Sequence, residues 1–381
     1  MEGGHAVKRF FLFILLILTI YIAKPLWEKP VSQYVDLTFL EPIDEKFETF
    51  LTSDSFTAVV QYISETTDEA IHFVLSKTID KDNTIVDVEK PALTKPEKSH
   101  ISIHNIELGT AEDAVTSTLG EPTRRSMNEY GTEWFTFHQE YHNFLMVSYD
   151  ENRHVNAIYT NDDLIASDAG IKYGTVKSVV RETYGEPLTE IRKGLNIYLL
   201  QDSEGFDLFE IGDMYAYIFY DLHQNETVTA VQLTAKSLEQ QKSGVYTQGD
   251  ADLREGFEAQ LFDLTNAARV RHGLPYLDWE GEVAGTARTH SLDMAKQNYF
   301  SHENKQGQSP FDRMKEDGIA FRAAGENLAY GQSSSVFAHE GLMNSIGHRE
   351  NILLNTYSHL GTGVAFNEKN QPYYTEKFLL K

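Results

Sequence analysis

The sequence motifs that could carry acid–base or metal chemistry lie in the last third of this 381-residue chain. His339 is followed directly by Glu340, but no second histidine stands at the spacing of a His-Glu-x-x-His zinc site. Ser301 precedes His302, yet no Gly-x-Ser-x-Gly segment offers the turn that presents a serine nucleophile. The chain has no cysteine, which excludes a thiol nucleophile, a disulfide scaffold and a Cys-ligated metal. Any site must therefore be assembled by the fold from residues distant in sequence.

Eight motifs follow one another along this last third. They are LTNAAR at 264–269, HSLDMA at 290–295, FSH at 300–302, SPFDRM at 309–314, GENLA at 325–329, MNSIGHRENIL at 343–353, GTGVA at 361–365 and YYTEKF at 373–378. In order and spacing they resemble the bacterial branch of the CAP superfamily, which comprises cysteine-rich secretory proteins, antigen 5 and pathogenesis-related 1 proteins. The resemblance covers 253–381.

The resemblance implies a cleft lined by two histidines and two glutamates, which binds a divalent metal in some family members. By motif, His302 and His348 correspond to the two histidines, and Glu326 corresponds to the first glutamate. Two neutral imidazoles and a carboxylate, completed by water, suit Zn²⁺ or a similar cation. In the simpler alternative, the two histidines are structural and tie loops to helices by hydrogen bonds.

The remaining cleft positions depart from the family pattern. Glu340 is the acid nearest to the place of the second glutamate, and Glu376 stands where bacterial relatives usually have glutamine. A carboxylate at Glu376 is expected to make the cleft more acidic, so that cation affinity or a neighbouring histidine pKa rises. Arg349 and Asn351 are expected to brace the loop around His348.

Two functions from different classes fit these residues. The first is a non-catalytic module that binds a glycan, a lipid or a partner protein of the cell envelope. The second is a metal-dependent hydrolase of peptide or glycan, with Glu326 as general base. A nucleic-acid partner is excluded, because a chain with a net charge of −24 and a pI near 4.9 cannot neutralise phosphates.

Hydrophobic periodicity indicates the elements that hold these motifs. Helices are predicted at 255–271, at 281–297, from Ser309-Pro310 onward and at 335–344. Alternating residues at 360–366 and 372–380 predict two strands. Helices followed by an antiparallel sheet predict an α+β fold, a three-layer α-β-α sandwich. The segment 253–381 has a net charge of only −3, so its composition marks it as a separate domain after a linker at 237–252.

An internal repeat precedes that linker, at 99–236. Gly109 and Thr110 recur as Gly174 and Thr175, and Gly-Glu-Pro at 120–122 recurs 65 residues later at 185–187. Each copy predicts a short helix followed by strands, at 133–138, 144–149 and 155–159 and then at 194–200, 206–211, 215–220 and 228–233. This duplicated helix-plus-meander domain is similar to the CAP-associated N-terminal domain of bacteria.

The N-terminus has the layout of a targeting segment. Lys8 and Arg9 precede an apolar run from Phe10 to Ala23, which is about 21 Å long as a helix and short for a membrane of about 30 Å. Residues 1–27 are predicted to be a signal anchor rather than a cleaved signal peptide, and 28–98 an acidic, partly helical stalk. The positive-inside rule then places the rest outside the membrane, or secreted if the segment is cleaved.

Overall fold

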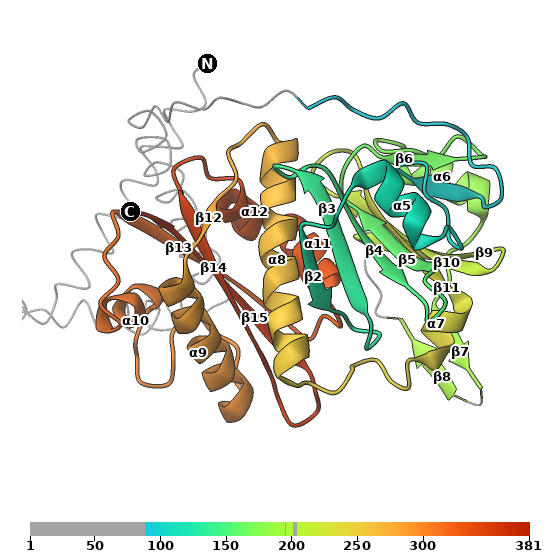
Figure 1. Cartoon of the computed structure of the whole chain (residues 1–381). Coiled ribbons are helices and arrows are strands. Elements are labelled where there is room, and N and C mark those ends of the chain that lie inside the picture. The colour runs from blue at the N-terminus through green and yellow to red at the C-terminus, as the bar shows by residue number, and fades with distance from the viewer. Residues whose placement is uncertain (1–87, 195, 201–203) are drawn as a thin grey trace, which may run out of the picture. The chain divides into compact units, whose positions relative to one another are not determined.

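The computed structural model of the chain describes residues 88–194, 196–200 and 204–381, which all belong to one structural unit (Figure 1). The predicted anchor at 1–27, and the predicted stalk as far as residue 87, lie outside the described residues. Among the residues that are described, no helix is both long and apolar enough to cross a membrane.

A seven-stranded antiparallel sheet forms the first half of the unit, in the order β2-β3-β4-β5-β11-β10-β9. Its strands are β2 (Arg124–Met127), β3 (Glu133–Gln139), β4 (His142–Tyr149), β5 (Val155–Thr160), β9 (Phe206–Ile211), β10 (Met214–Asp221) and β11 (Thr227–Ala235). The two segments with matching motifs therefore contribute four strands and three strands, and they meet where β5 pairs with β11.

Two helices with glycine ends cover one face of this sheet. They are α5 (Glu112–Leu119) and α6 (Lys177–Tyr184), whose buried Val115 and Val180 enter a core with Ile158 and Ile218. Each helix stops at a glycine with positive φ, 79° at Gly120 and 84° at Gly185, which a side chain rarely adopts. Smaller strands complete this half: β1 (Ile101–Ile103) with β6 (Ile165–Ser167), and β7 (Glu190–Lys193) with β8 (Asn196–Leu199).

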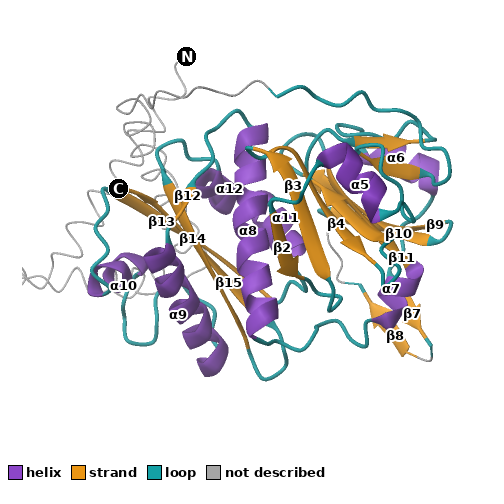
Figure 2. Ribbon diagram, viewed as in Figure 1, coloured by secondary structure: helices purple, strands orange, loops and turns teal. Residues whose placement is uncertain are grey.

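A four-stranded sheet in the order β12-β14-β15-β13 forms the second half. Its strands are β12 (Asp278–Trp279), β13 (Ala323–Tyr330), β14 (His359–Phe366) and β15 (Pro372–Leu380). Helices lie on both faces of it (Figure 2). Gly361 and Gly363 touch the backbone of α9 (Gly281–Gln297) so closely that a Cβ at either would lie 2.3 Å or less from a backbone nitrogen. Thr362, on the other face, donates its hydroxyl to the Glu258 carbonyl of α8 (Ala251–Arg271).

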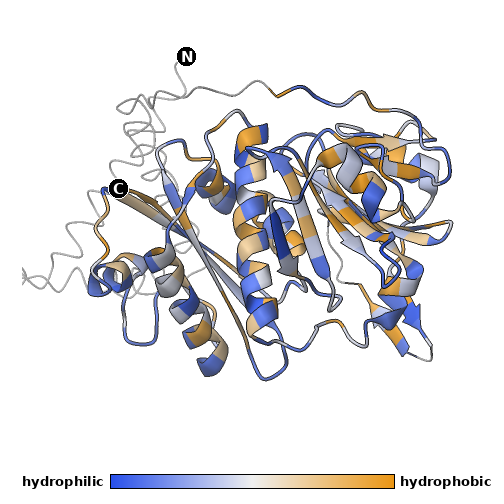
Figure 3. Cartoon of the chain, viewed as in Figure 1, coloured by the Kyte–Doolittle hydropathy of each residue, from blue (hydrophilic) through white to orange (hydrophobic). Residues whose placement is uncertain are grey.

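Helix α8 contacts both sheets, packing against β14 on one side and β2 on the other. A Cβ on Gly256 of α8 would lie 2.1 Å from the Met127 carbonyl oxygen of β2. Strand β2 is the blue strand beside α8 in Figure 3, and its Arg124 pairs with the buried Asp263 of α8 at 2.8 Å. Glycine and charge thus let this helix approach a polar edge strand closely.

The two halves share a hydrophobic core, although their compositions predict separate domains. Trp134, Tyr159 and Tyr217 of the seven-stranded sheet pack with Leu264 of α8 and Val336 of α11 (Ser335–Met343). The predicted linker also begins as a short helix, α7 (Lys236–Gln241). Composition alone does not reveal this contact, because it does not say which sheet face a neighbouring helix covers.

Candidate functional site

Glu326 lies at the centre of a buried charge cluster. It stands on β13 directly opposite Lys377 of β15, and Lys377 Nζ lies 2.6 Å from Glu326 Oε2. Arg313 of α10 (Pro310–Glu316) also donates to both carboxylate oxygens, at 2.9 and 3.2 Å. The His302 ring approaches Oε1 at 2.9 Å through Nδ1. The side chain of Glu326 is 2% exposed, so little of its carboxylate is open to a further ligand.

These partners keep Glu326 ionised. Burial opposes its charge, but the His302 hydrogen bond and the Lys377 and Arg313 cations outweigh burial, so the pKa of Glu326 falls to about 2. A general base works best when its pKa lies near the working pH. Glu326 is therefore poorly suited to accept a proton from water at neutral pH.

His302 lies on the loop between α9 and α10, and its side chain is half exposed. The loop is held in place from two directions. His290 of α9 contacts the Ser301 carbonyl through Nε2 at 3.0 Å, and Arg313 donates to the His302 carbonyl at 2.8 Å. Because Nδ1 of His302 bonds Glu326, Nε2 is the ring nitrogen available to a ligand.

His348 lies in the first turn of α12 (Ile346–Ile352), and its Nδ1 contacts the Ser345 hydroxyl at 2.8 Å. Burial lowers the pKa of His348, and the neighbouring His302 lowers it further by charge repulsion. The structure therefore brings the two predicted histidines near one another, each with Nδ1 engaged by the protein.

The three predicted metal ligands do not fit a metal together. Two cations and a histidine already hold the Glu326 carboxylate, which leaves only the two imidazoles. Within residues 88–194, 196–200 and 204–381, no group of three or more His, Asp or Glu side chains is arranged to hold a metal ion.

Glu376 does not contribute an acidic surface, contrary to the expectation from sequence. It is fully buried on β15, where it accepts hydrogen bonds from Thr265 Oγ1 at 2.5 Å and from Asn327 Nδ2 at 3.0 Å. Burial raises the pKa of Glu376 to about 7. Asn327 also donates to the His348 carbonyl, so Glu376 supports the α12 backbone through Asn327.

Glu340 is also placed differently from the expectation. It is buried on α11 and accepts a hydrogen bond of 2.6 Å from Tyr159 Oη of β5. Burial raises the pKa of Glu340 to about 7. This carboxyl bonds across the boundary between the two halves and makes no hydrogen bond to either histidine.

The comparisons with known proteins agree with this architecture. Residues 262–378 match the family described as "Cysteine-rich secretory protein family", and residues 108–244 match "CAP-associated N-terminal". An uncharacterized membrane protein of Bacillus subtilis, YlbC, is 30% identical over 290 residues, which are 71% of this chain and 82% of that protein. The chain belongs to the CAP family.

Solved structures of CAP proteins share the fold. An extracellular protein from Bacillus anthracis that contains an SCP domain matches with a TM-score of 0.63 and 28% identity, over 77% of this chain and all of that one. A cysteine-rich secretory protein from Staphylococcus aureus matches with a TM-score of 0.58 and 18% identity, over 72% and 91%. Both matches extend beyond the CAP domain.

The CAP motifs also hold residues whose roles the sequence analysis missed. Arg313 and Lys377 stand inside two quoted motifs, yet no pattern marks them as partners of Glu326. A strand prediction for the GENLA motif would have placed Glu326 beside β15, where a lysine follows Glu376. Asn351 donates to Asn327 Oδ1 at 3.0 Å and so links α12 to β13.

Arg349 has a partner in the upstream sheet. Its guanidinium donates to Asp221 Oδ2 at 2.8 Å, to the Met343 carbonyl at 3.2 Å, and lies 3.4 Å from His272 Nε2. Both side chains are about nine-tenths buried. Arg349 therefore anchors the CAP domain to the seven-stranded sheet, which we call the CAP-associated sheet because it lies in the match at 108–244.

Proposed function

We propose that this chain is a membrane-anchored protein of the cell exterior whose CAP domain binds an envelope ligand without catalysing a reaction. The ion-paired state of Glu326 supports a binding role, because Lys377 and Arg313 hold this carboxylate and it is not free to activate water. The half-exposed His302 ring, with the partly buried His348 ring nearby, offers a polar contact for a glycan, a lipid head group or a partner protein. The names of the Bacillus relatives, one a membrane protein and one extracellular, support the location.

Sedimentation with envelope material tests the binding role. The full-length chain would be mixed separately with purified cell-wall fragments, lipid vesicles and envelope protein, and the soluble phase analysed for released fragments. We expect retention by one of these materials without release of products, and weaker retention of His302→Ala. Glu303 is exposed and follows His302 directly, so Glu303→Ala is the matched control.

Two results would overturn the proposal. Retention by none of the three materials would remove the binding role. Released fragments that disappear in His302→Ala would favour the hydrolase. Zinc titration calorimetry separately tests the metal prediction, since one tightly bound ion lost in both His302→Ala and His348→Ala would favour that same alternative.

A further inference from the structure

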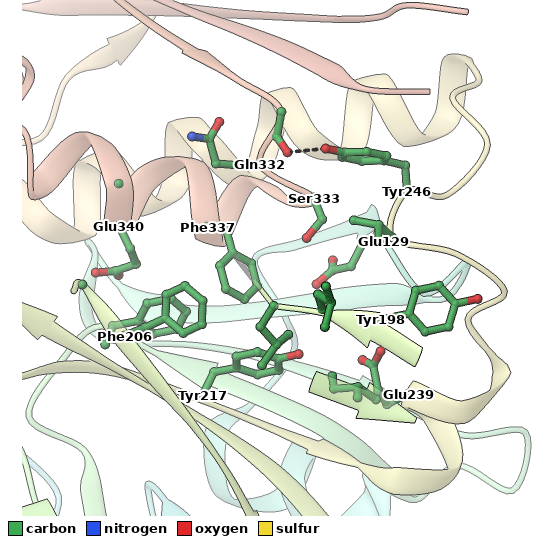
Figure 4. Close-up of a pocket in the computed structure, with 18 of the residues that line it drawn as sticks. Glu129, Tyr198, Phe206, Tyr217, Glu239, Tyr246, Gln332, Ser333, Phe337 and Glu340 are labelled. Carbon is green, nitrogen blue, oxygen red and sulfur yellow. Dashed lines mark hydrogen bonds between the residues drawn. The ribbon is translucent and has the colours of Figure 1, made fainter. Parts of the chain in front are cut away.

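A cavity of about 540 Å³ lies between the CAP domain and the CAP-associated sheet (Figure 4). Its lining includes neither His302 nor His348. One wall comes from the seven-stranded sheet and the β7–β8 hairpin, and the other comes from α11 and the segment before it. Its size falls within the range of sites for small organic molecules, about 300–1,000 Å³.

Aromatic rings form much of the wall. Phe337 of α11 meets Phe206 and Tyr217 of the sheet edge to face, with centroids 5.3 and 5.2 Å apart. Tyr198 of β8 lines the cavity on its hairpin side, as Figure 4 shows. The apolar Leu199 also lines the cavity and is 76% exposed, so the entrance offers apolar surface to an incoming molecule.

Glu129 faces this cavity from the turn between β2 and β3, and neither carboxylate oxygen has a partner within hydrogen-bonding geometry. The residue is 2% exposed, and neither oxygen accepts a hydrogen bond. The indole N–H of Trp134 is close enough to lower the pKa of Glu129 as a hydrogen-bond donor would, but the contact falls outside hydrogen-bonding geometry. An unsatisfied buried carboxylate is costly, typically about 1–3 kcal/mol or more.

The position of Glu129 is fixed by its surroundings. Asn128 Oδ1 accepts hydrogen bonds from the backbone N–H groups of Tyr130 and Thr132, which shape the turn. Thr247 donates its hydroxyl to the Glu129 carbonyl, which ties the turn to the segment before α8. The turn is held on both sides, and the carboxylate of Glu129 is directed into the cavity (Figure 4).

Nearby charges leave Glu129 without a direct counter-ion. Lys193 Nζ lies 2.5 Å from Glu239 Oε1, so these two buried side chains neutralise each other. Lys242 acts on Glu129 at longer range, and among the described residues no cation lies within ion-pair distance of it. Burial raises the pKa of Glu129 and lowers the pKa of Lys242. With Glu204 and Glu340 also in the lining, carboxylates outnumber cations around the cavity.

We propose that this interdomain cavity binds a protonated amine carried on an apolar body, with the ammonium beside Glu129 and the body against the aromatic rings. A cation supplies the missing hydrogen-bond donors and the counter-charge together. Aromatic faces attract the same group, and they also bury its hydrocarbon part. The inference is independent of the histidine pair.

Calorimetric titration of the full-length chain with phenethylamine tests the proposal, with 2-phenylethanol as the neutral ligand of the same shape. We expect the amine to bind at least about tenfold more tightly than the alcohol, a difference of about 1.4 kcal/mol. Glu129→Gln should remove that preference, whereas the exposed Glu133→Gln should keep it. Equal binding of both compounds, binding of neither, or an unchanged preference in Glu129→Gln would each overturn the proposal.

Two further measurements sharpen the result. Nα-acetyl-lysine amide carries its amine on an aliphatic stem, so its affinity relative to phenethylamine distinguishes a peptide side chain from a free aromatic amine as the source. Thermal unfolding without ligand should show Glu129→Gln to be at least as stable as the parent, because the unpaired carboxylate is gone. A lower unfolding temperature would mean that Glu129 already has a stabilising partner, which contradicts the proposal.

Discussion

Replacing Glu326 with glutamine should destabilise the protein strongly. The substitution leaves the Lys377 and Arg313 side chains, which are 0% and 8% exposed, without their counter-charge. Removing one partner of a buried ion pair typically costs about 3–5 kcal/mol, because the other charge stays buried and unpaired. The same cluster predicts an asymmetry. Lys377→Met still leaves a one-to-one pair between Arg313 and Glu326, so it should cost clearly less.

The pKa of Glu326 gives a second measure of the same contribution. A fall from 4.5 to about 2 corresponds to about 3 kcal/mol. Because the folded-state pKa lies below the unfolded one, this stability is fully present above pH 4.5 and is lost as the pH falls toward 2. The penalty of Glu326→Gln should therefore be about 2 kcal/mol smaller at pH 3 than at pH 7.

Urea unfolding of the parent, Glu326→Gln and Lys377→Met at pH 7 and pH 3 measures these differences. Glu350→Gln removes an exposed carboxylate near His348 and is the matched control, expected to change stability by less than about 0.5 kcal/mol. A penalty for Glu326→Gln no greater than that of Lys377→Met would refute the reasoning. So would a penalty of equal size at both pH values.

Three further predictions concern the buried carboxyl group of Glu376, the close approach of α8 to β2, and the contact between the two halves of the structure. Glu376→Gln should make the free energy of unfolding less dependent on pH between pH 4.5 and 7. In the parent, the raised pKa of Glu376 lowers the stability by about 3 kcal/mol as the pH rises through this range. Equal changes in the free energy of unfolding of the two proteins between pH 5 and pH 8 would contradict this. Gly256→Ala should lower the unfolding temperature by forcing α8 from β2, whereas Gly285→Ala on α9 meets no atom within 4 Å and should be neutral or stabilising. Arg349→Met should cost about 3 kcal/mol by leaving Asp221 buried and unpaired, and Asp221→Asn in the same background should recover part of that loss in a double-mutant cycle.

Periodicity predicted the regular elements well. The helix expected at 281–297 has those bounds, and the strands expected at 133–138 and 206–211 differ from the structure by one residue or less. Strand β13 was missed because Ala323–Tyr330 has no β-branched residue and contains glycine and asparagine, which strands disfavour. Helix α12 was missed because its seven residues are too few to show a helical period.

The site was less predictable than the fold. Motif order predicted His302 and His348 as cleft residues, and the structure brings them near one another. The surroundings of each glutamate depend on tertiary contacts that no spacing encodes. Glu326 meets a cation across a strand pair, Glu340 meets a tyrosine from the other sheet, and Glu376 meets a threonine of α8. A carboxyl group is ionised or neutral according to these neighbours.

The contacts of α11 and α12 connect the histidine pair to the domain boundary. Arg349 follows His348 directly on α12 and bonds Asp221 of the CAP-associated sheet. Ser345, which holds the His348 ring, also lines the interdomain cavity. Ser345 therefore belongs both to the wall of that cavity and to the surroundings of the His348 ring. The boundary between the two halves thus contributes side chains to the support of the histidine site.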